Sequence, residues 1–276
     1  MTPEISVSIV LFRTPIAQLR RCISSLHYYK KSIRLFLIDN SPTDTLRSEI
    51  SQIYPYKYVH LPHNPGFGTA HNLAIRAAQL IGSHYHLVIN ADVSFTTDII
   101  SPMVDYMEKN LQIGLLMPKV TYPDGRIQRL CKLLPTPLDF LVRRLASAGI
   151  RASYNERFEM HNSGYDRIMF VPYLSGCFML LRQSALKEVG LFDERYFMYP
   201  EDIDLTRRMA EKYETVFFPS VAIVHEHGAA SRKSIHLMLI HAVNTIKYFN
   251  KWGWFWDPKR RLLNKKALGQ FHTRSP

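Results

Sequence analysis

Apolar segments alternate with amphipathic segments through the first 120 residues, and this alternation restricts the fold more than any other feature. Strands are predicted at 5–12, 35–38, 56–60, 86–93 and 113–120, with helices beginning at residue 15 and spanning 69–81 and 98–109. The connections between them are short. Such alternation is typical of parallel βαβ units. We therefore predict an α/β fold with a mostly parallel, doubly wound central sheet flanked by helices.

Two common nucleotide-binding motifs are missing from this sequence. The first strand is followed by Phe12-Arg13-Thr14-Pro15, where a dinucleotide-binding fold would carry G-x-G-x-x-G. No G-x-x-x-x-G-K-[ST] segment occurs anywhere in the chain. The pattern therefore disfavours dehydrogenases and phosphate-loop ATPases.

Polar side chains follow two of the predicted strands. Asp39 ends the second strand, and Asn90 and Asp92 follow the apolar run 87–89. Carboxyl ends of parallel strands face one crevice, and residues i and i+2 point the same way. Asn90 and Asp92 could hold a divalent cation on a diphosphate, or simply form a polar strand end. Asp39 could bind a base or ribose, or form an Asx-turn.

The second half of the sequence is less regular. Tyr122-Pro123-Asp124-Gly125 predicts a hairpin turn, and residues 140–145 predict a short helix. Residues 153–166 are polar and aromatic without a clear period, so we expect a loop that crosses one sheet edge. The apolar strand 174–181 is interrupted by Ser175-Gly176, where a ligand or another backbone segment could approach closely.

Two later segments contain groups that could act chemically. Pro200 begins a helix with Glu201, Asp202 and Asp204 in its first turn. These acids could serve the helix dipole, or one of them could be a general base. The strand 221–224 ends at His225, which is either structural or a metal ligand beside Asp92.

The C-terminal segment carries most of the positive charge. Ten Lys or Arg residues and a single acid, Asp257, follow Gly228, while the net charge of the whole chain is +12. Trp252, Trp254 and Trp256 lie in the same segment. We expect a helix over 234–250, followed either by a Trp/Lys anchor at a membrane surface or by tryptophans packed on the domain or a second subunit. No nucleic-acid recognition module accompanies the charge, so nucleic acid is not an expected partner.

The remaining composition indicates where the protein works. The three cysteines are scattered, odd in number and not in metal-ligand spacing, which favours a reducing cytosol. No signal peptide and no apolar run near ~20 residues is evident. We expect a cytoplasmic protein that associates peripherally with the inner face of the membrane.

Together, these segments resemble the inverting nucleotide-sugar glycosyltransferases of family 2, which have the GT-A fold. The resemblance covers roughly residues 5–234 and rests on the ordered set VSIVLF, LIDNS, NPGFGTAHN, INADV, LSGCFML, GLFDERYFMYPEDIDL and VHEHG. The sequence looks closest to bacterial rhamnosyltransferases that build O-antigen, capsule or cell-wall polysaccharide. QRLCKLLPTP and FNKWGW favour the same interpretation. The implied organisation is a catalytic domain at 1–232, with a nucleotide-binding half (1–120) and an acceptor-side half (121–232), followed by a basic, Trp-rich helical extension at 233–276.

The resemblance also implies roles for individual residues. The implied nucleotide-binding residues are Val10, Phe12, Asp39, Asn40, Asn72, Asn90 and Ala91. Gly176 and Glu201 would lie beside the donor or acceptor sugar. Asp92 and His225 would bind Mg²⁺ or Mn²⁺, and Asp202 would be the general base. Asn90 replaces the first acid of the family's Asp-x-Asp, so the metal would depend mainly on Asp92.

The implied reaction is transfer of a sugar with inversion. The expected donor is a nucleotide sugar, most simply dTDP-L-rhamnose, and the acceptor is a saccharide or a polyprenyl-diphosphate-linked saccharide. A UDP-hexose donor and a non-catalytic sugar-nucleotide or polysaccharide-binding homologue are the alternatives. A homodimer is also compatible with the sequence.

Overall fold

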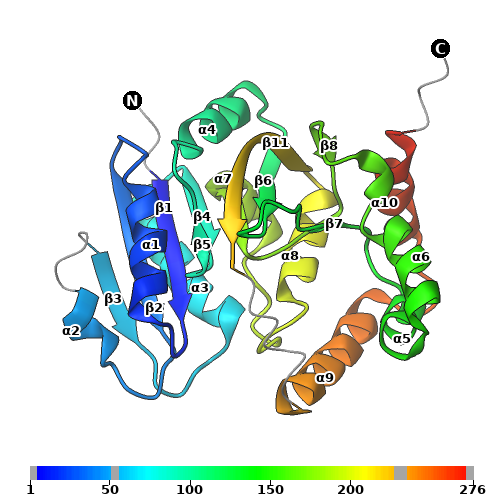
Figure 1. Cartoon of the computed structure of the whole chain (residues 1–276), viewed down its shortest axis with the longest axis horizontal. Coiled ribbons are helices and arrows are strands. Elements are labelled where there is room, and N and C mark those ends of the chain that lie inside the picture. Colours follow the sequence, from blue (N-terminus) through cyan, green and yellow to red (C-terminus); the bar gives the residue numbers. More distant parts are fainter. Residues whose placement is uncertain (1–4, 51–55, 227–234, 272–276) are drawn as a thin grey trace.

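A nine-stranded sheet forms the centre of the protein in a computed structural model that describes residues 5–50, 56–226 and 235–271 (Figure 1). Its order is β3-β2-β1-β4-β10-β6-β11-β5, and β8 pairs with β11. Strands β1, β2, β3, β4, β6 and β11 run in one direction, whereas β5, β8 and β10 run against them. The predicted α/β class with a mostly parallel central sheet is confirmed.

The bounds of the elements follow the chain. The strands are β1 (Ile5–Leu11), β2 (Ile33–Asp39), β3 (Tyr56–His60), β4 (Tyr85–Ile89), β5 (Val93–Ser94), β6 (Ile113–Thr121), β7 (Cys131–Lys132), β8 (Met169–Phe170), β9 (Tyr173–Leu174), β10 (Phe178–Arg182) and β11 (Glu214–His225). The helices are α1 (Ile16–Leu26), α2 (Leu46–Ile50), α3 (Phe67–Leu80), α4 (Ile100–Lys109), α5 (Pro137–Leu145), α6 (Ala148–Phe158), α7 (Gln183–Val189), α8 (Glu201–Ala210), α9 (Ile235–Trp252) and α10 (Pro258–Gly269).

The parallel strands of the N-terminal half end together on the carboxyl-terminal side of the sheet. Leu11 pairs with Asp39, and Asp39 pairs with His60. Strand β4 runs parallel to β1 and ends at Ile89, directly before Asn90. The polar strand ends predicted from the sequence therefore face a common crevice, because their strands share a direction and a register.

Strand β10 brings the second half of the chain next to these strand ends. It lies antiparallel between β4 and β6, and Phe178 pairs with Ile89. The backbone N–H of Asn90 donates to the Cys177 carbonyl across a distance of 2.9 Å. The interruption at Ser175-Gly176 thus lies where the strand enters the sheet, beside the Asn90–Asp92 segment.

The predicted loop at 153–166 is wrong in its first half, because residues up to Phe158 belong to helix α6. Phe158 is the helix's buried residue, and most of the others are exposed. A helix that buries so little of its surface has no apolar stripe. The period on which helix prediction depends is consequently absent from this stretch.

The predicted hairpin turn is present. The Gly125 N–H donates to the Tyr122 carbonyl, and the Gln128 N–H donates to the Val120 carbonyl. Gly125 has a φ of +83°, a conformation that favours glycine. The hairpin folds residues 127–128 back along the end of β6, and Gln128 thereby reaches β11, which pairs with β6.

The C-terminal helices pack on α8. Asp257 forms two hydrogen bonds with the Arg207 guanidinium, at 2.6 and 2.7 Å, and both side chains are buried. The same guanidinium lies 3.9 Å from the centre of a Trp252 ring. The Asp204 carboxylate accepts hydrogen bonds from Lys251 and from the Trp252 indole. Trp252 is therefore a packing residue, as one of the two sequence interpretations proposed.

Helices α5, α6, α9 and α10 gather at one end of the sheet, far from β3 and α2 (Figure 1). The helix expected over 234–250 is confirmed as α9, whose bounds are Ile235–Trp252. A second C-terminal helix, α10, was not predicted. None of the helices in the described ranges is long and apolar enough to cross a membrane.

Candidate active site

A carboxylate and an imidazole meet at the edge of the sheet. Asp92 lies between β4 and β5, and His225 is the last residue of β11; β11 pairs with β5. The Asp92 Oδ1 atom lies 3.3 Å from His225 Nε2. The predicted pair of metal ligands is therefore adjacent in space, although 133 positions separate the two residues in the sequence.

Gln128 fixes the orientation of this histidine. Its amide nitrogen donates to the backbone carbonyls of His225 and Thr121, so its amide oxygen must face His225 Nδ1, at 2.9 Å. An amide oxygen only accepts hydrogen bonds, and Nδ1 therefore carries the proton. In the neutral imidazole, the Nε2 lone pair then points at the Asp92 carboxylate.

Two electron-rich atoms that face one another at 3.3 Å require a positive charge. A cation bound between Nε2 and the carboxylate would supply that charge. A histidine whose other nitrogen is held by a hydrogen bond is the usual arrangement of a metal ligand. The donor set of Asp92 and His225 therefore fits a divalent cation such as Mg²⁺ or Mn²⁺.

These two side chains do not form a complete coordination shell. Within the described ranges, no group of three or more His, Cys, Asp or Glu residues could hold a metal ion. A hard cation takes six or more oxygen or nitrogen ligands, so the others would have to come from water and from a bound ligand. Such an incomplete shell is suitable for a cation that binds together with a diphosphate.

The second chemical feature is a pair of acids at the start of α8. Asp202 Oδ2 accepts a hydrogen bond of 3.1 Å from the Gly176 N–H, and Oδ1 accepts one of 2.8 Å from the Ile203 N–H. Desolvation raises the pKa of Asp202 above its usual value, and the backbone hydrogen bonds oppose that increase. Charged Lys132 also opposes it.

Glu201 lies in a poorer environment than Asp202. It is buried, and its Oε2 atom has no hydrogen-bond partner. Desolvation, followed by the neighbouring Asp202 charge, raises the pKa of Glu201 to about 8. Two backbone N–H donors favour the ionised form of Asp202, whereas Glu201 Oε2 has no such donor, so the proton of this acid pair is favoured on Glu201. A general base must be ionised, and the backbone hydrogen bonds to Asp202 favour that form.

The segment 176–177 connects the acid pair, Glu201 and Asp202, to the predicted metal pair, Asp92 and His225. Gly176 donates to Asp202, and the next residue, Cys177, accepts from Asn90. Consecutive Cα atoms lie about 3.8 Å apart, so the two groups of residues border one small region. Burial raises the pKa of the Cys177 thiol to about 12, and the Asp92 and Asp202 carboxylates contribute to the same increase.

Gly176 cannot be replaced without displacing Asp202. A Cβ atom at this position would lie 3.3 Å from Asp202 Cβ and 3.4 Å from a Phe67 ring carbon. The sequence left open whether a ligand or another chain segment approaches this glycine. The structure shows the close approach of Asp202, so Gly176 helps to position the acid.

Four of the predicted nucleotide-binding residues, Val10, Phe12, Asp39 and Asn40, lie at the ends of β1 and β2. Asp39 is fully buried, and it accepts hydrogen bonds from the Ser41 N–H and the Tyr58 hydroxyl. Asn40 is 2% exposed and donates to the Gly66 carbonyl, while its Oδ1 atom has no partner. Phe12 is 51% exposed, and Val10 is partly buried and pairs with Ile38 on the neighbouring strand. Asn40 Oδ1 is thus a buried acceptor without a partner.

Asn72 has a structural role that the sequence did not predict. Its amide oxygen accepts from the Phe192 N–H, and its amide nitrogen donates to the Phe192 carbonyl and to Glu194. The side chain is completely buried. Contact with a nucleotide, which the resemblance implies, would require Asn72 to leave these partners.

The glycine-containing loop before α3 approaches the chain itself. A Cβ atom on Gly66, whose φ is +96°, would lie 2.2 Å from the Phe197 carbonyl oxygen. The Phe67 N–H donates to the same oxygen. The close approach that this glycine permits is made by the protein backbone, and the loop ties α3 to the segment that precedes α8.

Two residues at this site were missed from the sequence. Gln128 and Lys132 belong to a stretch without periodicity, and no local pattern marks a glutamine as the partner of a histidine 97 positions away. The predicted turn at 122–125 was the available signal, because a hairpin there returns Gln128 to the end of β6. Lys132 is recognised only from its effect on the pKa of Asp202.

Comparison with known proteins decides the family. The model of the glycosyl transferase family 2 matches residues 6–190. The chain belongs to this family. Family 2 membership identifies it as a glycosyltransferase, and its sheet as that of the GT-A fold.

Sequence relatives of this family 2 protein are rhamnosyltransferases. It is 28% identical to the N-acetylglucosaminyl-diphospho-decaprenol L-rhamnosyltransferase of Mycobacterium tuberculosis, over 99% of this chain and 93% of the relative. It is 25% identical to the rhamnosyltransferase WbbL of Escherichia coli K12, over 74% of this chain and 72% of WbbL. The expected resemblance to rhamnosyltransferases of family 2 is confirmed.

Solved structures support the fold. The mannosyltransferase PcManGT from Pyrobaculum calidifontis, in complex with GDP-Man and Mn²⁺, aligns with a TM-score of 0.62 at 14% identity, over 99% of this chain and 71% of PcManGT. GalNAc-T7 with UDP, GalNAc and Mn²⁺ aligns with a TM-score of 0.59 at 15% identity. That alignment covers 81% of this chain and 43% of GalNAc-T7, so the chain spans less than half of that protein.

Proposed function

We propose that this family 2 glycosyltransferase transfers L-rhamnose from dTDP-L-rhamnose to a hydroxyl of a polyprenyl-diphosphate-linked saccharide, with inversion. One observation carries the proposal: Asp202 is separated from the Asp92–His225 pair by only the Gly176–Cys177 segment. A base and a diphosphate site thus flank one region, where a sugar would lie between acceptor and leaving group. The names of the two rhamnosyltransferase relatives support the choice of sugar and of acceptor.

In this mechanism, Asp202 removes the proton from the acceptor hydroxyl while that oxygen attacks the anomeric carbon. The bond from that carbon to the diphosphate breaks on the opposite face, so the configuration inverts. Asp92 and His225 would hold a divalent cation, Mg²⁺ or Mn²⁺, which supplies positive charge for the departing nucleoside diphosphate. Protonated Glu201 adds no second negative charge beside Asp202, and it borders the sugar together with Gly176.

The nucleoside would lie at the ends of β1 and β2. Phe12 and Val10 would contact the base, and Asp39 would support the pocket by holding Ser41 and Tyr58. Asn40 Oδ1, a buried acceptor without a partner, is suited to the N–H of a pyrimidine. Asn90 and Ala91 would approach the diphosphate from the end of β4.

The C-terminal extension would bring the enzyme to the inner face of the membrane. On α9, Leu239, Val243 and Ile246 are exposed at helical spacing, and Phe255 and Trp256 are exposed after it. Apolar side chains beside many Lys and Arg residues are typical of a surface that binds lipid headgroups. A homodimer through the same face is the competing arrangement. Sedimentation with phospholipid vesicles, together with the mass in solution, separates the two.

A thermal-shift screen of nucleoside diphosphates tests the proposed donor. Because the Asp92–His225 pair needs a cation to bind a diphosphate, we expect dTDP to raise the melting temperature only when Mn²⁺ or Mg²⁺ is present. Asp92→Asn should abolish the metal-dependent part of the shift. A shift confined to UDP would remove the rhamnosyl assignment, and a dTDP shift that is independent of metal would remove the metal site.

A further inference from the structure

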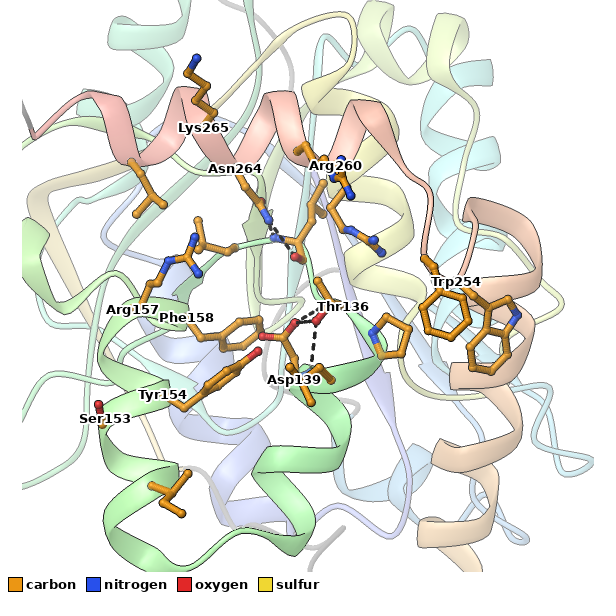
Figure 2. Close-up of a pocket in the computed structure, with 18 of the residues that line it drawn as sticks. Thr136, Asp139, Ser153, Tyr154, Arg157, Phe158, Trp254, Arg260, Asn264 and Lys265 are labelled. Atoms are coloured by element: carbon orange, nitrogen blue, oxygen red, sulfur yellow. Dashed lines mark hydrogen bonds between the residues drawn. The ribbon is translucent and has the colours of Figure 1, made fainter.

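A large groove separates α5 and α6 from α10 (Figure 2). Its volume is about 1260 Å³, compared with about 470 Å³ for a second hollow beside Ser41. No residue of the acid pair, the metal pair or the expected nucleotide pocket lines it. The groove is therefore separate from the residues expected to bind the nucleotide sugar.

The surface of the groove is largely apolar. Leu133, Leu134 and Phe158 form its buried part, and Ile150 and Phe255 are exposed at its rim. The polar groups at its base are already bonded within the chain: Thr136 and Asp139 form a capping box, and Asn264 bonds both backbone groups of Leu134. The polar groups at the base are therefore not free to bind a sugar or a base, and this part of the groove suits a hydrocarbon chain.

Cations line the same groove without acidic partners. Arg157 extends from α6 toward α10 (Figure 2), and Arg261 and Lys265 lie on α10. In the described ranges, none of these three side chains forms an ion pair. The one carboxylate in the lining, Asp139, is used by the capping box. The groove therefore combines an apolar surface with uncompensated positive charge, and an anionic amphiphile complements both.

A short stretch of chain links this groove to the active site. Gln128 holds the metal-binding histidine, and six residues later Leu134 lines the groove. Six residues of extended chain span at most roughly 20 Å. Lys132 lies on this stretch, and its charge lowers the pKa of Asp202. An acceptor bound in the groove by its lipid could therefore present its sugar to the base.

We propose that the groove binds the acceptor's polyprenyl diphosphate. The first isoprene units would lie on Leu133, Leu134 and Phe158, and the diphosphate would lie against Arg157 and Arg261. The exposed Ile150 and Phe255 would lead the remaining chain toward the bilayer. This assignment depends on the proposed function for the identity of the acceptor, but binding to the groove can be measured without any transfer.

Geranylgeranyl diphosphate is a suitable probe for titration calorimetry with the full chain. We expect it to bind more tightly than either inorganic diphosphate or geranylgeraniol, because only the intact amphiphile satisfies both parts of the groove. The charge-reversal variant Arg157→Glu/Arg261→Glu should bind it roughly tenfold more weakly or worse, since two cations facing a diphosphate become anions. Equal binding by this variant and the parent would overturn the proposal.

Lys109→Glu/Lys187→Glu is the matched control. Both lysines are exposed on helices outside the groove and form no ion pair within the described residues, so the net charge changes equally. We expect this control to bind the probe within roughly twofold of the parent. A second pair, Ile150→Asp and Leu111→Asp, tests the apolar part, because both side chains are exposed but only Ile150 lines the groove. A loss of binding confined to Ile150→Asp supports the assignment.

Two further measurements distinguish a specific polyprenyl diphosphate site from a general lipid surface, and the groove assignment from the donor assignment. If phosphatidylglycerol vesicles lose attachment in the Arg157→Glu/Arg261→Glu variant while geranylgeranyl diphosphate never binds the parent, the groove is a general lipid surface and the proposal fails. The dTDP thermal shift should be the same in the parent and in all four variants. Absence of that shift in the parent, together with groove-dependent binding of the probe, would refute the proposed donor and leave the groove assignment standing.

Discussion

At the scale of single residues, the site depends on which groups carry protons. Glu201 and Asp202 are neighbours in the sequence, yet their surroundings separate their roles. Asp202 receives two backbone N–H donors, whereas Glu201 Oε2 receives none. The sequence predicted Asp202 as the base through the resemblance alone, and burial and hydrogen bonding now supply a physical reason for the choice.

Glu201→Gln tests the proton assignment through the pH dependence of stability. The folded chain keeps Glu201 protonated up to a pKa of about 8, while the unfolded chain releases the proton near 4.5. The folded state thus binds the extra proton between these values, and its stability falls as the pH rises through that window, by up to about 1.4 kcal/mol per pH unit.

The glutamine variant has no proton to lose, so it should lack this decline. Urea unfolding of parent and variant from pH 5 to pH 8 measures the difference directly. We also expect Glu201→Gln to retain most of its transferase activity at pH 7, because glutamine resembles the protonated acid. Identical pH slopes for the two proteins would show that Glu201 is ionised in the folded chain.

Gln128→Leu tests whether the hydrogen bond from His225 Nδ1 to Gln128 supports metal binding. Leucine cannot accept the His225 Nδ1 proton, so the imidazole loses the hydrogen bond that orients it. We expect the concentration of Mn²⁺ needed for half-maximal activity to rise roughly 10- to 100-fold. Gln128→Glu can still accept that proton and should need much less metal than the leucine variant. If the two variants and the parent required equal metal, Gln128 would have no part in the site.

At the scale of elements, the C-terminal helices are held by a buried ion pair. Arg207 of α8 and Asp257 at the start of α10 are each less than 4% exposed, and the Asp257 carboxylate also caps α10 by accepting from the Arg260 N–H. Burial alone would raise the pKa of Asp257, but the Arg207 guanidinium bonded to it holds that pKa below its usual value. This contact sets the position of α10, and with it one side of the groove.

Asp257→Ala should therefore cost about 3–5 kcal/mol of unfolding free energy, because it leaves the Arg207 charge buried without its partner. Lys259→Ala is the control: it removes an exposed ion pair with Glu211 on the same stretch and should cost roughly 0–1 kcal/mol. Chemical denaturation measures both. Comparable small losses for the two variants would mean that α10 is held by its other contacts.

Elements with strong periodicity were predicted, and those without it were not. Strand β3 was predicted at its observed bounds, and α3 began two residues earlier than expected, because Gly66 adopts a positive φ that starts the helix. Helix α6 was missed, since it buries little of its surface. The partners of β10 were also unpredictable, because antiparallel insertion between β4 and β6 depends on contacts distant in sequence.

The same limit applies to the site. Asp92, His225 and Asp202 could be named as candidates because they follow strands or begin a helix, and the resemblance then implied their roles. Gln128 was not, because its importance comes from reaching a residue on another strand. Asn72 was expected at a nucleotide, but its burial under Phe192 and Glu194 arises from a loop 120 residues later in the sequence.

At the scale of the whole molecule, the site and the groove lie on opposite ends of a single short segment. Residues 128–134 begin at Gln128, which is hydrogen-bonded to His225, and end at Leu134, which lines the apolar groove. The family model covers residues 6–190 and so includes Gln128 and Asp92, whereas His225 and the C-terminal helices that complete the groove lie beyond it. The boundary proposed near residue 232 would therefore separate two parts of the sequence that serve one reaction.

The rate of sugar transfer by Asp202→Asn tests this account most directly. The amide keeps the size of the side chain but cannot accept the acceptor's proton. With the proposed donor and a polyprenyl-diphosphate-linked acceptor, we expect kcat to fall roughly 10²- to 10⁴-fold, while the metal-dependent thermal shift by dTDP stays at the parent value. Transfer at the parent rate by a folded, nucleotide-binding Asp202→Asn protein would contradict the assignment of the base.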